Sequence, residues 1–142
     1  TYGKAKGYEP KDAVKYGMYT YLDGVIEKYV PGDYEFDLPS KFLDLYKAKD
    51  YGPYADKKIG DVVVSFITTN DITGGNSGSP VLDANGNLIG LAFDGNYEAL
   101  SHKIAFDSEL NRTICVDVRY VLWCIDKLGG AKHIVDELKL VQ

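Results

Sequence analysis

The middle of the chain carries short apolar runs with the lengths and spacing of β-strands. Residues 62–67 form a continuous run of β-branched and aromatic side chains, which is typical of a buried strand. Further strands are predicted at residues 80–82, 88–93 and 113–118. The Asn85-Gly86 pair, between the first two of these three, is a strong signal for a tight hairpin. The pattern therefore predicts β structure here.

The flanking regions have helical patterns. After residue 120, one helical stripe of apolar residues ends at Gly129-Gly130, and it consists of Val121, Leu122, Ile125 and Leu128. A last helix is expected at residues 131–140. Upstream, residues 16–22 resemble a strand leading into a short helix at 23–29. Another helix is expected at residues 41–46, with Ser40 as its N-cap. The fold class is therefore mainly β with flanking α-helices.

Composition excludes several kinds of partner. The 142 residues form one domain with a net charge of −5, and no basic cluster is present, which argues against binding to nucleic acid or to an anionic membrane. No apolar run is long enough to span a bilayer. No leader-like segment opens the chain, but for a piece of a longer protein this says nothing about export.

Two cysteines are present, and neither has the environment of a reactive group. Cys115 falls on a predicted strand and Cys124 on the following helix, which favours buried free thiols over a disulfide. No second Cys or His stands at ligand spacing, so no metal site and no cofactor are predicted.

The segment Gly74-Gly75-Asn76-Ser77-Gly78-Ser79-Pro80 carries the most specific chemical signal. A serine between glycines, closed by Gly-Ser-Pro and followed by a hairpin, resembles the nucleophile loop of chymotrypsin-like peptidases. Ser77 is then the nucleophile, and the N–H groups of Gly75 and Ser77 form the oxyanion hole, where small residues leave the approach open. An ordinary glycine-rich loop of a β-domain is the alternative reading. The likeness implies a chymotrypsin-like (trypsin-like serine protease) β-barrel.

The other members of a catalytic triad are not in the expected order. Chymotrypsin-like enzymes run His, Asp, Ser along the chain, whereas both histidines here, His102 and His133, follow Ser77. An α/β-hydrolase order would need a strand-to-helix elbow, but a hairpin follows this serine. His102 and His133 are therefore interpreted as structural. We expect the base and its aspartate to come from an upstream part of a longer protease, because 142 residues are too few for two barrels.

Several longer segments resemble the S46 family of bacterial dipeptidyl peptidases. They span nearly the whole chain and include residues 7–14, 31–39, 69–80, 90–96, 104–107, 111–114 and 116–122. The resemblance implies the second barrel of a double-barrel peptidase domain, with residues 1–142 as its C-terminal part. Within it, residues 1–58 would be a mixed lead-in, 59–119 the barrel strands and 120–142 the C-terminal helices.

The resemblance also implies an activity and a setting. Family members release dipeptides from peptide N-termini, are exported to the periplasm, cell surface or medium of Gram-negative bacteria, and form homodimers. Expected partners are therefore peptides with a free N-terminus, the missing N-terminal part of the same protein and, at full length, a second copy. The isolated chain would be inactive, because it lacks the histidine and aspartate.

Specificity is expected from the strand that follows the nucleophile. In chymotrypsin-like barrels this strand borders the P1 pocket, which places Phe93, Asp94 and Gly95 beside the peptide. By resemblance Asp94 holds the free α-amine, a strong charge-assisted contact. Gly95 stands where acid-preferring members carry an arginine, so an apolar or broad P1 preference is expected. Tyr97 departs from the family pattern, which has a tryptophan there.

Asp71 has two possible roles. It precedes Ser77 by six residues, the offset at which trypsin-like peptidases bind a basic P1 side chain. The S46 resemblance instead puts Asp71 in a lead-in turn. Two rival functions also remain, a chymotrypsin-like endopeptidase of another family and a binding module that kept the barrel and lost the chemistry.

Overall fold

The structure, a computed structural model, describes residues 1–101 and 106–141. The chain divides into two compact units. Unit 1 combines Thr1–Thr20 with Ser65–Val118, and unit 2 combines Tyr21–Val64 with the residues from Arg119 onward. Both units are therefore built from segments far apart in the sequence.

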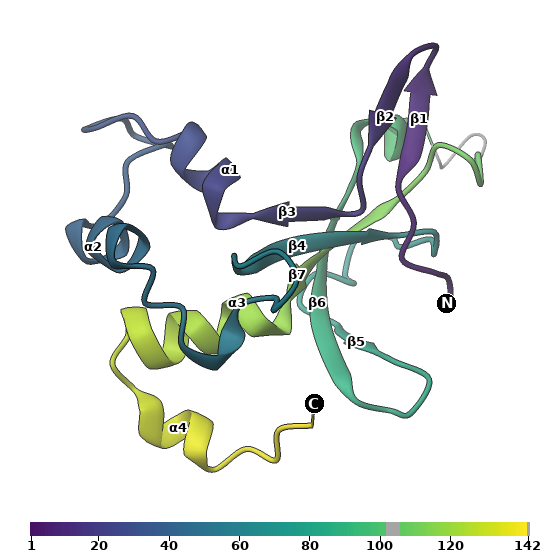
Figure 1. Cartoon of the computed structure of the whole chain (residues 1–142). Coiled ribbons are helices and arrows are strands. Elements are labelled where there is room, and N and C mark those ends of the chain that lie inside the picture. Colours follow the sequence, from purple (N-terminus) through teal and green to yellow (C-terminus); the bar gives the residue numbers. More distant parts are fainter. Residues whose placement is uncertain (102–105, 142) are drawn as a thin grey trace. The chain divides into compact units, whose positions relative to one another are not determined.

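Unit 1 is organised by a five-stranded sheet (Figure 1). Its strands, in spatial order, are β3 (Tyr19–Tyr21), β4 (Val63–Thr68), β7 (Thr113–Asp117), β6 (Leu88–Gly95) and β5 (Pro80–Leu82). The pairs β4–β7, β7–β6 and β6–β5 are antiparallel. The four strands predicted between residues 62 and 118 are confirmed, and β6 continues two residues beyond its predicted end, to Gly95. The predicted mixture of β structure and helices is confirmed as well.

A second, two-stranded sheet precedes the first in sequence. It is the hairpin of β1 (Tyr8–Lys11) and β2 (Val14–Tyr16), drawn in purple in Figure 1. Its turn contains Ala13 with φ +62°, a conformation that alanine seldom adopts. The sequence pattern did not reveal this hairpin, because its strands are short and mostly exposed and its turn lacks the usual glycine or asparagine.

The core of the large sheet comes from three adjacent strands. Phe66, Ala92 and Cys115 are buried on β4, β6 and β7, and they are flanked by the partly buried Tyr19, Val81 and Ile89. Gly90 leaves room for the Phe66 ring, since a Cβ at Gly90 would lie 2.7 Å from that ring. Cys115 carries a free thiol whose pKa is raised by burial, in agreement with its predicted structural role.

Unit 2 is helical. Its elements are α1 (Leu22–Glu27), α2 (Ser40–Ala48), the 3₁₀ turn η1 (Gly52–Tyr54), α3 (Val118–Trp123), the π-helical turn η3 (Cys124–Leu128) and α4 (Lys132–Asp136). The prediction of Ser40 as N-cap was wrong by one residue. Ser40 begins α2, and the carbonyl of Pro39 accepts hydrogen bonds from the N–H groups of Phe42 and Leu43. The last helix is also shorter than predicted and ends at Asp136.

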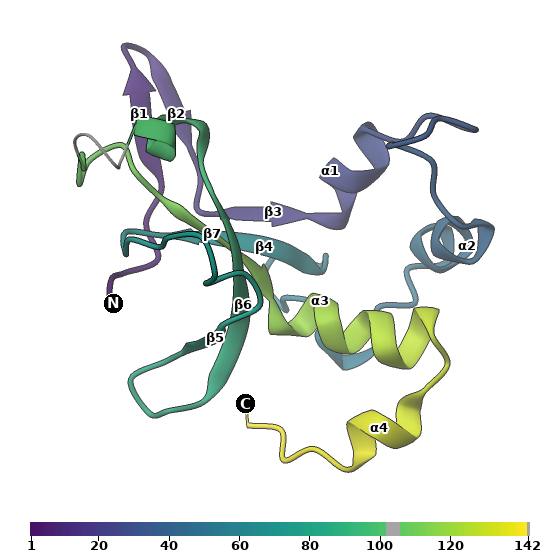
Figure 2. The same ribbon diagram turned by 180° about the vertical axis from the view of Figure 1, so that it is seen from behind.

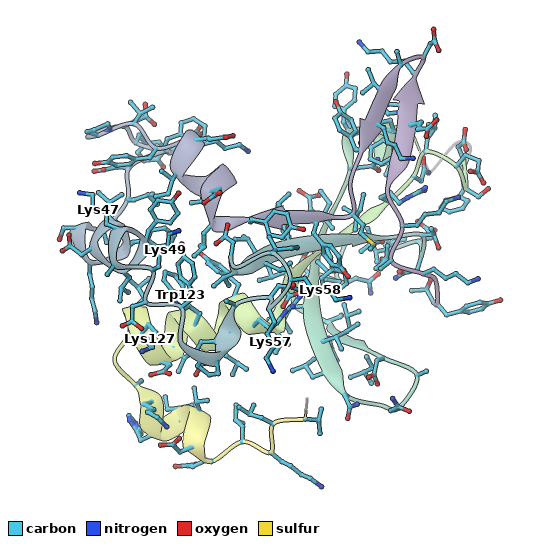
Figure 3. All side chains as sticks on the ribbon, viewed as in Figure 1. Lys47, Lys49, Lys57, Lys58, Trp123 and Lys127 are labelled. Atoms are coloured by element: carbon cyan, nitrogen blue, oxygen red, sulfur yellow. The ribbon has the colours of Figure 1, made fainter. Side chains whose placement is uncertain are left out.

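Trp123 is the central side chain of unit 2. It is fully buried, and its ring meets the edge of Phe42 with 5.2 Å between ring centroids. Its indole N–H donates to the carbonyl of Asp50, whose carboxylate also pairs with Lys127 at 2.7 Å. Figure 3 labels Trp123 and Lys127 on this part of the chain. These contacts fix the segment after α2 against the helix that carries Trp123.

Candidate active site

The loop that carries Ser77 is folded on itself by backbone and side-chain hydrogen bonds. The N–H of Thr73 donates to the side-chain oxygen of Asn76 at 2.9 Å, and the N–H of Asn76 donates back to the carbonyl of Thr73 at 3.1 Å. Gly75 and Gly78 adopt φ angles of +100° and +83°. Only glycine adopts these angles readily, so backbone conformation explains both residues. A Cβ at Gly75 would meet no described atom within 4 Å.

The same loop is joined to the edge of β6. Gly78 donates its N–H to the carbonyl of Ala92 at 2.7 Å, and the N–H of Ala92 donates to the carbonyl of Ser79 at 2.9 Å. Ser77, between these anchors and Gly75, is exposed, and its hydroxyl donates to the carbonyl of Phe93 at 3.3 Å. The hydroxyl is thus placed at the surface of the sheet, where a substrate can reach it.

The predicted oxyanion donors are two backbone N–H groups of the same loop. Within the described part of the chain, the N–H groups of Gly75 and Ser77 donate no hydrogen bond. Backbone N–H groups without a partner, on a surface loop next to a serine, can receive the negative oxygen of a tetrahedral intermediate. Both N–H groups of the predicted oxyanion pair are thus without a partner among the described residues.

Phe93 occupies a bulge in β6. Ala92 pairs with Cys115 and Asp94 with the adjacent Ile114, so Phe93 is an extra residue on one side of the ladder. A bulge reverses the alternation of side chains after it. Phe93 and Asp94 are both exposed as a result, next to the loop of Ser77.

A cavity of about 340 Å³ lies beside the nucleophile loop, and every residue that lines it belongs to unit 1. Four of the predicted site residues are brought together in its wall, and they are Ser77, Phe93, Asp94 and Gly95. Gly75 is not part of the wall, although its neighbour Gly74 is. The volume corresponds to a site for one side chain or a small ligand.

Asp94 contributes a carboxylate to the cavity wall, whereas Gly95 contributes no side chain. One carboxylate oxygen of Asp94 accepts the N–H of Gly95 at 2.8 Å, and the other has no partner among the described residues. At Gly95 an added Cβ would lie 3.2 Å from the Cβ of Ala99. A side chain at this position therefore needs only a small shift of a neighbouring methyl group.

Asp71 also lines the cavity and is exposed. The structure thus places it in the same cavity wall as Ser77. His102 lies outside the described residues. His133 is exposed on α4, in unit 2.

Sequence reasoning missed one wall of the cavity. Its buried members are Asn96, Asn111, Arg112 and Thr113, all at or near the ends of β6 and β7. The one available signal was a charged residue, Arg112, at the start of an apolar strand.

Within residues 1–101 and 106–141, no cluster of His, Cys, Asp and Glu is suited to hold a metal, and none of the helices has the length and apolarity to cross a bilayer.

Comparison with known proteins gives one consistent match. The family model for peptidase S46 matches residues 1–140. An Asp/Glu-specific dipeptidyl-peptidase of Flavobacterium psychrophilum is 58% identical over 141 residues, which are 99% of this chain and 20% of that protein. A dipeptidyl-peptidase 7 of Capnocytophaga gingivalis is also 58% identical, over 146 residues covering 100% of this chain and 20% of the relative. The chain spans about a fifth of the length of these curated relatives.

A solved structure matches the fold. The crystal structure of DPP11 from Porphyromonas endodontalis, in complex with the dipeptide Arg-Glu, superimposes with a TM-score of 0.91 at 44% sequence identity. The match covers 95% of this chain and 19% of that protein.

Proposed function

The chain belongs to the peptidase S46 family, and on that premise we propose that it is the nucleophile-bearing part of a longer serine dipeptidyl peptidase. The observation that carries this proposal is the position of Ser77. It is an exposed hydroxyl on a loop joined to β6, with a cavity next to it and, nearby, two backbone N–H groups that have no partner among the described residues. These are the parts that acyl transfer needs from one side of a protease cleft.

In the proposed mechanism Ser77 attacks the carbonyl carbon after the second residue of a peptide. The N–H groups of Gly75 and Ser77 stabilise the oxyanion, and the amine leaves as an acyl-enzyme forms at Ser77. A histidine takes the proton of the hydroxyl and gives it to the leaving amine, and an aspartate orients that histidine, both supplied by another part of the protein. A water molecule, deprotonated by the same histidine, then hydrolyses the acyl-enzyme and frees Ser77. The five-stranded sheet then belongs to the second, chymotrypsin-like barrel of a double-barrel domain.

Asp94 gives the proposed enzyme its exopeptidase character. Its carboxylate lies in the cavity wall and has one oxygen without a partner among the described residues. A free α-ammonium group bound there forms a strong charge-assisted hydrogen bond, whereas a blocked N-terminus leaves the carboxylate without a counter-charge. The cleavage point then falls a fixed distance from the N-terminus.

Gly95 favours an apolar or broad P1 preference. Gly95 itself places no charged group in the wall. Arg112 also lines the cavity, but its guanidinium already donates to four backbone carbonyls, so a P1 carboxylate buried there would be poorly compensated. The names of the relatives do not decide this point, because proteins called dipeptidyl-peptidase 7 and Asp/Glu-specific dipeptidyl-peptidase are equally similar to this chain.

A basic P1 preference is the second candidate, because Asp71 lies in the same wall. The substitution Asp71→Asn separates the two. Loss of cleavage after Arg and Lys alone assigns the basic P1 site to Asp71, whereas an unchanged P1 profile leaves it structural.

The wider setting is also proposed from the family resemblance. The full-length protein would be exported to the periplasm, surface or medium of a Gram-negative bacterium, and would act as a homodimer. The 142-residue chain alone would be inactive, since loss of the catalytic base typically reduces kcat by several orders of magnitude.

The test compares the full-length protein, its Ser77→Ala variant and the isolated chain on fluorogenic dipeptides with free and blocked N-termini. We expect the full-length protein to cleave only the free-amine substrates and to lose about 10⁴-fold or more in kcat with Ser77→Ala. Ser65→Ala is the matched control, because its hydroxyl contacts Thr20 on the sheet at 2.6 Å and does not line the cavity.

Other outcomes identify the rival functions. Cleavage of blocked substrates at comparable rates would make the protein an endopeptidase. A full-length protein that folds and binds peptides but cleaves none would be a binding module on the same scaffold.

A further inference from the structure

We propose that Arg112 is a positioning residue for the substrate cavity, which it shapes by joining the N-terminal segment to the wall formed at the ends of β6 and β7. The inference rests on the proposed function, because it concerns the P1 selectivity of the same cavity. Arg112 itself lines the cavity and is only 2% exposed.

The guanidinium group of Arg112 contacts two distant parts of the chain. It donates to the carbonyls of Lys6 at 3.1 Å and Gly7 at 3.0 Å, just before β1. It also donates to the carbonyls of Ser108 at 3.0 Å and Asn111 at 2.7 Å, in the loop that leads into β7. Four of its hydrogen bonds therefore serve the protein's own backbone, and Arg112 acts on a substrate through the wall that it supports.

The ring of Tyr8 lies next to the guanidinium group of Arg112. The central carbon of the guanidinium lies 5.5 Å from the centre of the Tyr8 ring, a cation–π distance. The Tyr8 hydroxyl donates to Glu98 at 2.9 Å, in η2 (Tyr97–Ser101), the turn that follows β6. In both Figure 1 and Figure 2 the β1–β2 hairpin stands beside this turn. The hairpin thus supports the wall from behind.

Asn96 completes the connection to the specificity strand. The N–H of Arg112 donates to the Asn96 side-chain oxygen at 2.8 Å, and the N–H of Asn96 donates to the carbonyl of Arg112 at 2.9 Å. The Asn96 amide group also donates to Glu98 and to the carbonyl of Leu110, each at 2.8 Å. Because Asn96 directly follows Asp94 and Gly95, a shift of Arg112 moves the residues that face the substrate.

Arginine is the residue type that this arrangement requires. A planar, permanently charged fork reaches carbonyls on both sides at once, whereas lysine offers one ammonium group that cannot span them. No described carboxylate forms an ion pair with Arg112, so the four carbonyls and the Tyr8 ring provide its compensation. Replacing the guanidinium would leave one buried and three partly buried carbonyls without this donor, and we expect the wall to rearrange as they seek water.

The experiment uses the full-length protein with Arg112→Lys and, as a milder variant, Tyr8→Leu. Arg119→Lys is the matched control, because Arg119 pairs with Asp56 at 3.3 Å in unit 2 and does not line the cavity. Each protein is assayed on free-amine dipeptides with P1 Ala, Leu and Phe. A small sulfonyl fluoride, which does not fill the cavity, measures the reactivity of Ser77 separately, and thermal melting measures folding.

We expect Arg112→Lys to lower the Phe-to-Ala ratio of kcat/KM by about tenfold or more, mainly through KM for the large side chain. Tyr8→Leu should lower the ratio in the same direction by a smaller factor. The rate of labelling by the sulfonyl fluoride should stay within about twofold of wild type, because the loop of Ser77 keeps its own hydrogen bonds. Arg119→Lys should leave both readouts unchanged.

Two results overturn the inference. One is an active protein in which both Arg112→Lys and Tyr8→Leu keep the wild-type P1 ratio. The other is an equal loss for all P1 residues together with slower labelling, which indicates general damage to the fold. If Arg112→Lys does not fold, Tyr8→Leu decides alone. A wild-type protein that releases no dipeptides would instead refute the proposed function, and the inference would fail with it.

Discussion

The two walls of the cavity are built by different means. The nucleophile loop is short, exposed and rich in glycine, and it is held by hydrogen bonds between residues close in sequence and by its attachment to β6. The opposite wall is buried and polar, and Arg112 there contacts Lys6, a residue 106 positions away. The Thr113 hydroxyl, on the buried wall, donates to the carbonyl of Asn70, in the segment that leads into the nucleophile loop, at 2.6 Å.

We expect the two walls to have different roles in the reaction. A loop fixed by its own backbone can present a nucleophile and two donors in a constant geometry whatever substrate is bound. A wall assembled from segments distant in sequence can instead be reshaped by substitutions at residues far from the nucleophile. The loop should then govern kcat, and the buried wall should govern the choice of P1 residue.

The largest effect that tests this comparison is expected from Gly75→Ala in the full-length protein. The alanine must leave φ +100°, which turns one of the two proposed oxyanion donors away, so kcat should fall by about 10²–10³-fold with little change in KM. Steady-state kinetics on one good dipeptide substrate measures this. The matched control is Gly86→Ala, which has a similar φ of +82° in the β5–β6 turn.

Both alanine variants place a side chain at a positive φ, +100° at residue 75 and +82° at residue 86, so both should lose stability. Only the variant at Gly75 should lose kcat. An equal loss of kcat in both variants would show that strain alone, and not the position of the donor, controls the rate.

The next effect concerns the other wall. Gly95→Arg adds to the cavity a cation that, unlike Arg112, is not already bound to backbone carbonyls. The cost is a small displacement of Ala99, whose Cβ lies 3.2 Å from the position of the new Cβ. We expect the ratio of kcat/KM for P1 Glu over P1 Leu to rise by about 10²-fold, because a buried carboxylate gains a partner. A P1 panel measures the ratio, with Gly95→Gln as a control of similar reach without the charge.

A rise with Gln as large as with Arg would contradict the electrostatic explanation. Unchanged ratios in both variants would remove residue 95 from the P1 site.

Much of the first wall could be predicted from the sequence, and little of the second. The Ser77 loop and the strands around it follow from local glycine, proline and apolar patterns, which act over a few residues. The bulge at Phe93 could not be predicted, since it depends on the register between β6 and β7. The role of Arg112 depends on carbonyls about a hundred residues away, and no local pattern contains that information. The β1–β2 hairpin was missed for a related reason, because it is stabilised by Tyr8, Arg112 and Glu98 rather than by its own turn.

A smaller effect is expected from Asp94→Asn. The amide keeps an oxygen to accept the N–H of Gly95, but the charge is lost. We expect KM for free-amine dipeptides to rise by about tenfold, with kcat nearly unchanged, because a charge-assisted contact becomes a neutral one. Asp107→Asn is a control, since that carboxylate accepts backbone N–H groups in its own loop and does not line the cavity. A fall in kcat without a change in KM would assign Asp94 to the transition state instead of to substrate binding.

The smallest effect is expected from Tyr8→Phe, which separates the two contributions of Tyr8. The ring stays near the guanidinium of Arg112, and only the hydrogen bond to Glu98 is lost. Stability should fall by about 1 kcal/mol, and the P1 ratio should change by less than about twofold.

Burial raises the pKa of Tyr8 above its ordinary value, so the folded state favours the neutral phenol. That part of the stability is fully present below the ordinary tyrosine pKa of about 10 and is lost as the pH rises through the higher folded value. Chemical unfolding at pH 8 and at pH 10.5 measures it: the difference between wild type and Tyr8→Phe should shrink at the higher pH. A difference that grows would mean that the hydroxyl is ionised in the folded protein, and that the hairpin supports the wall through charge rather than through a neutral donor.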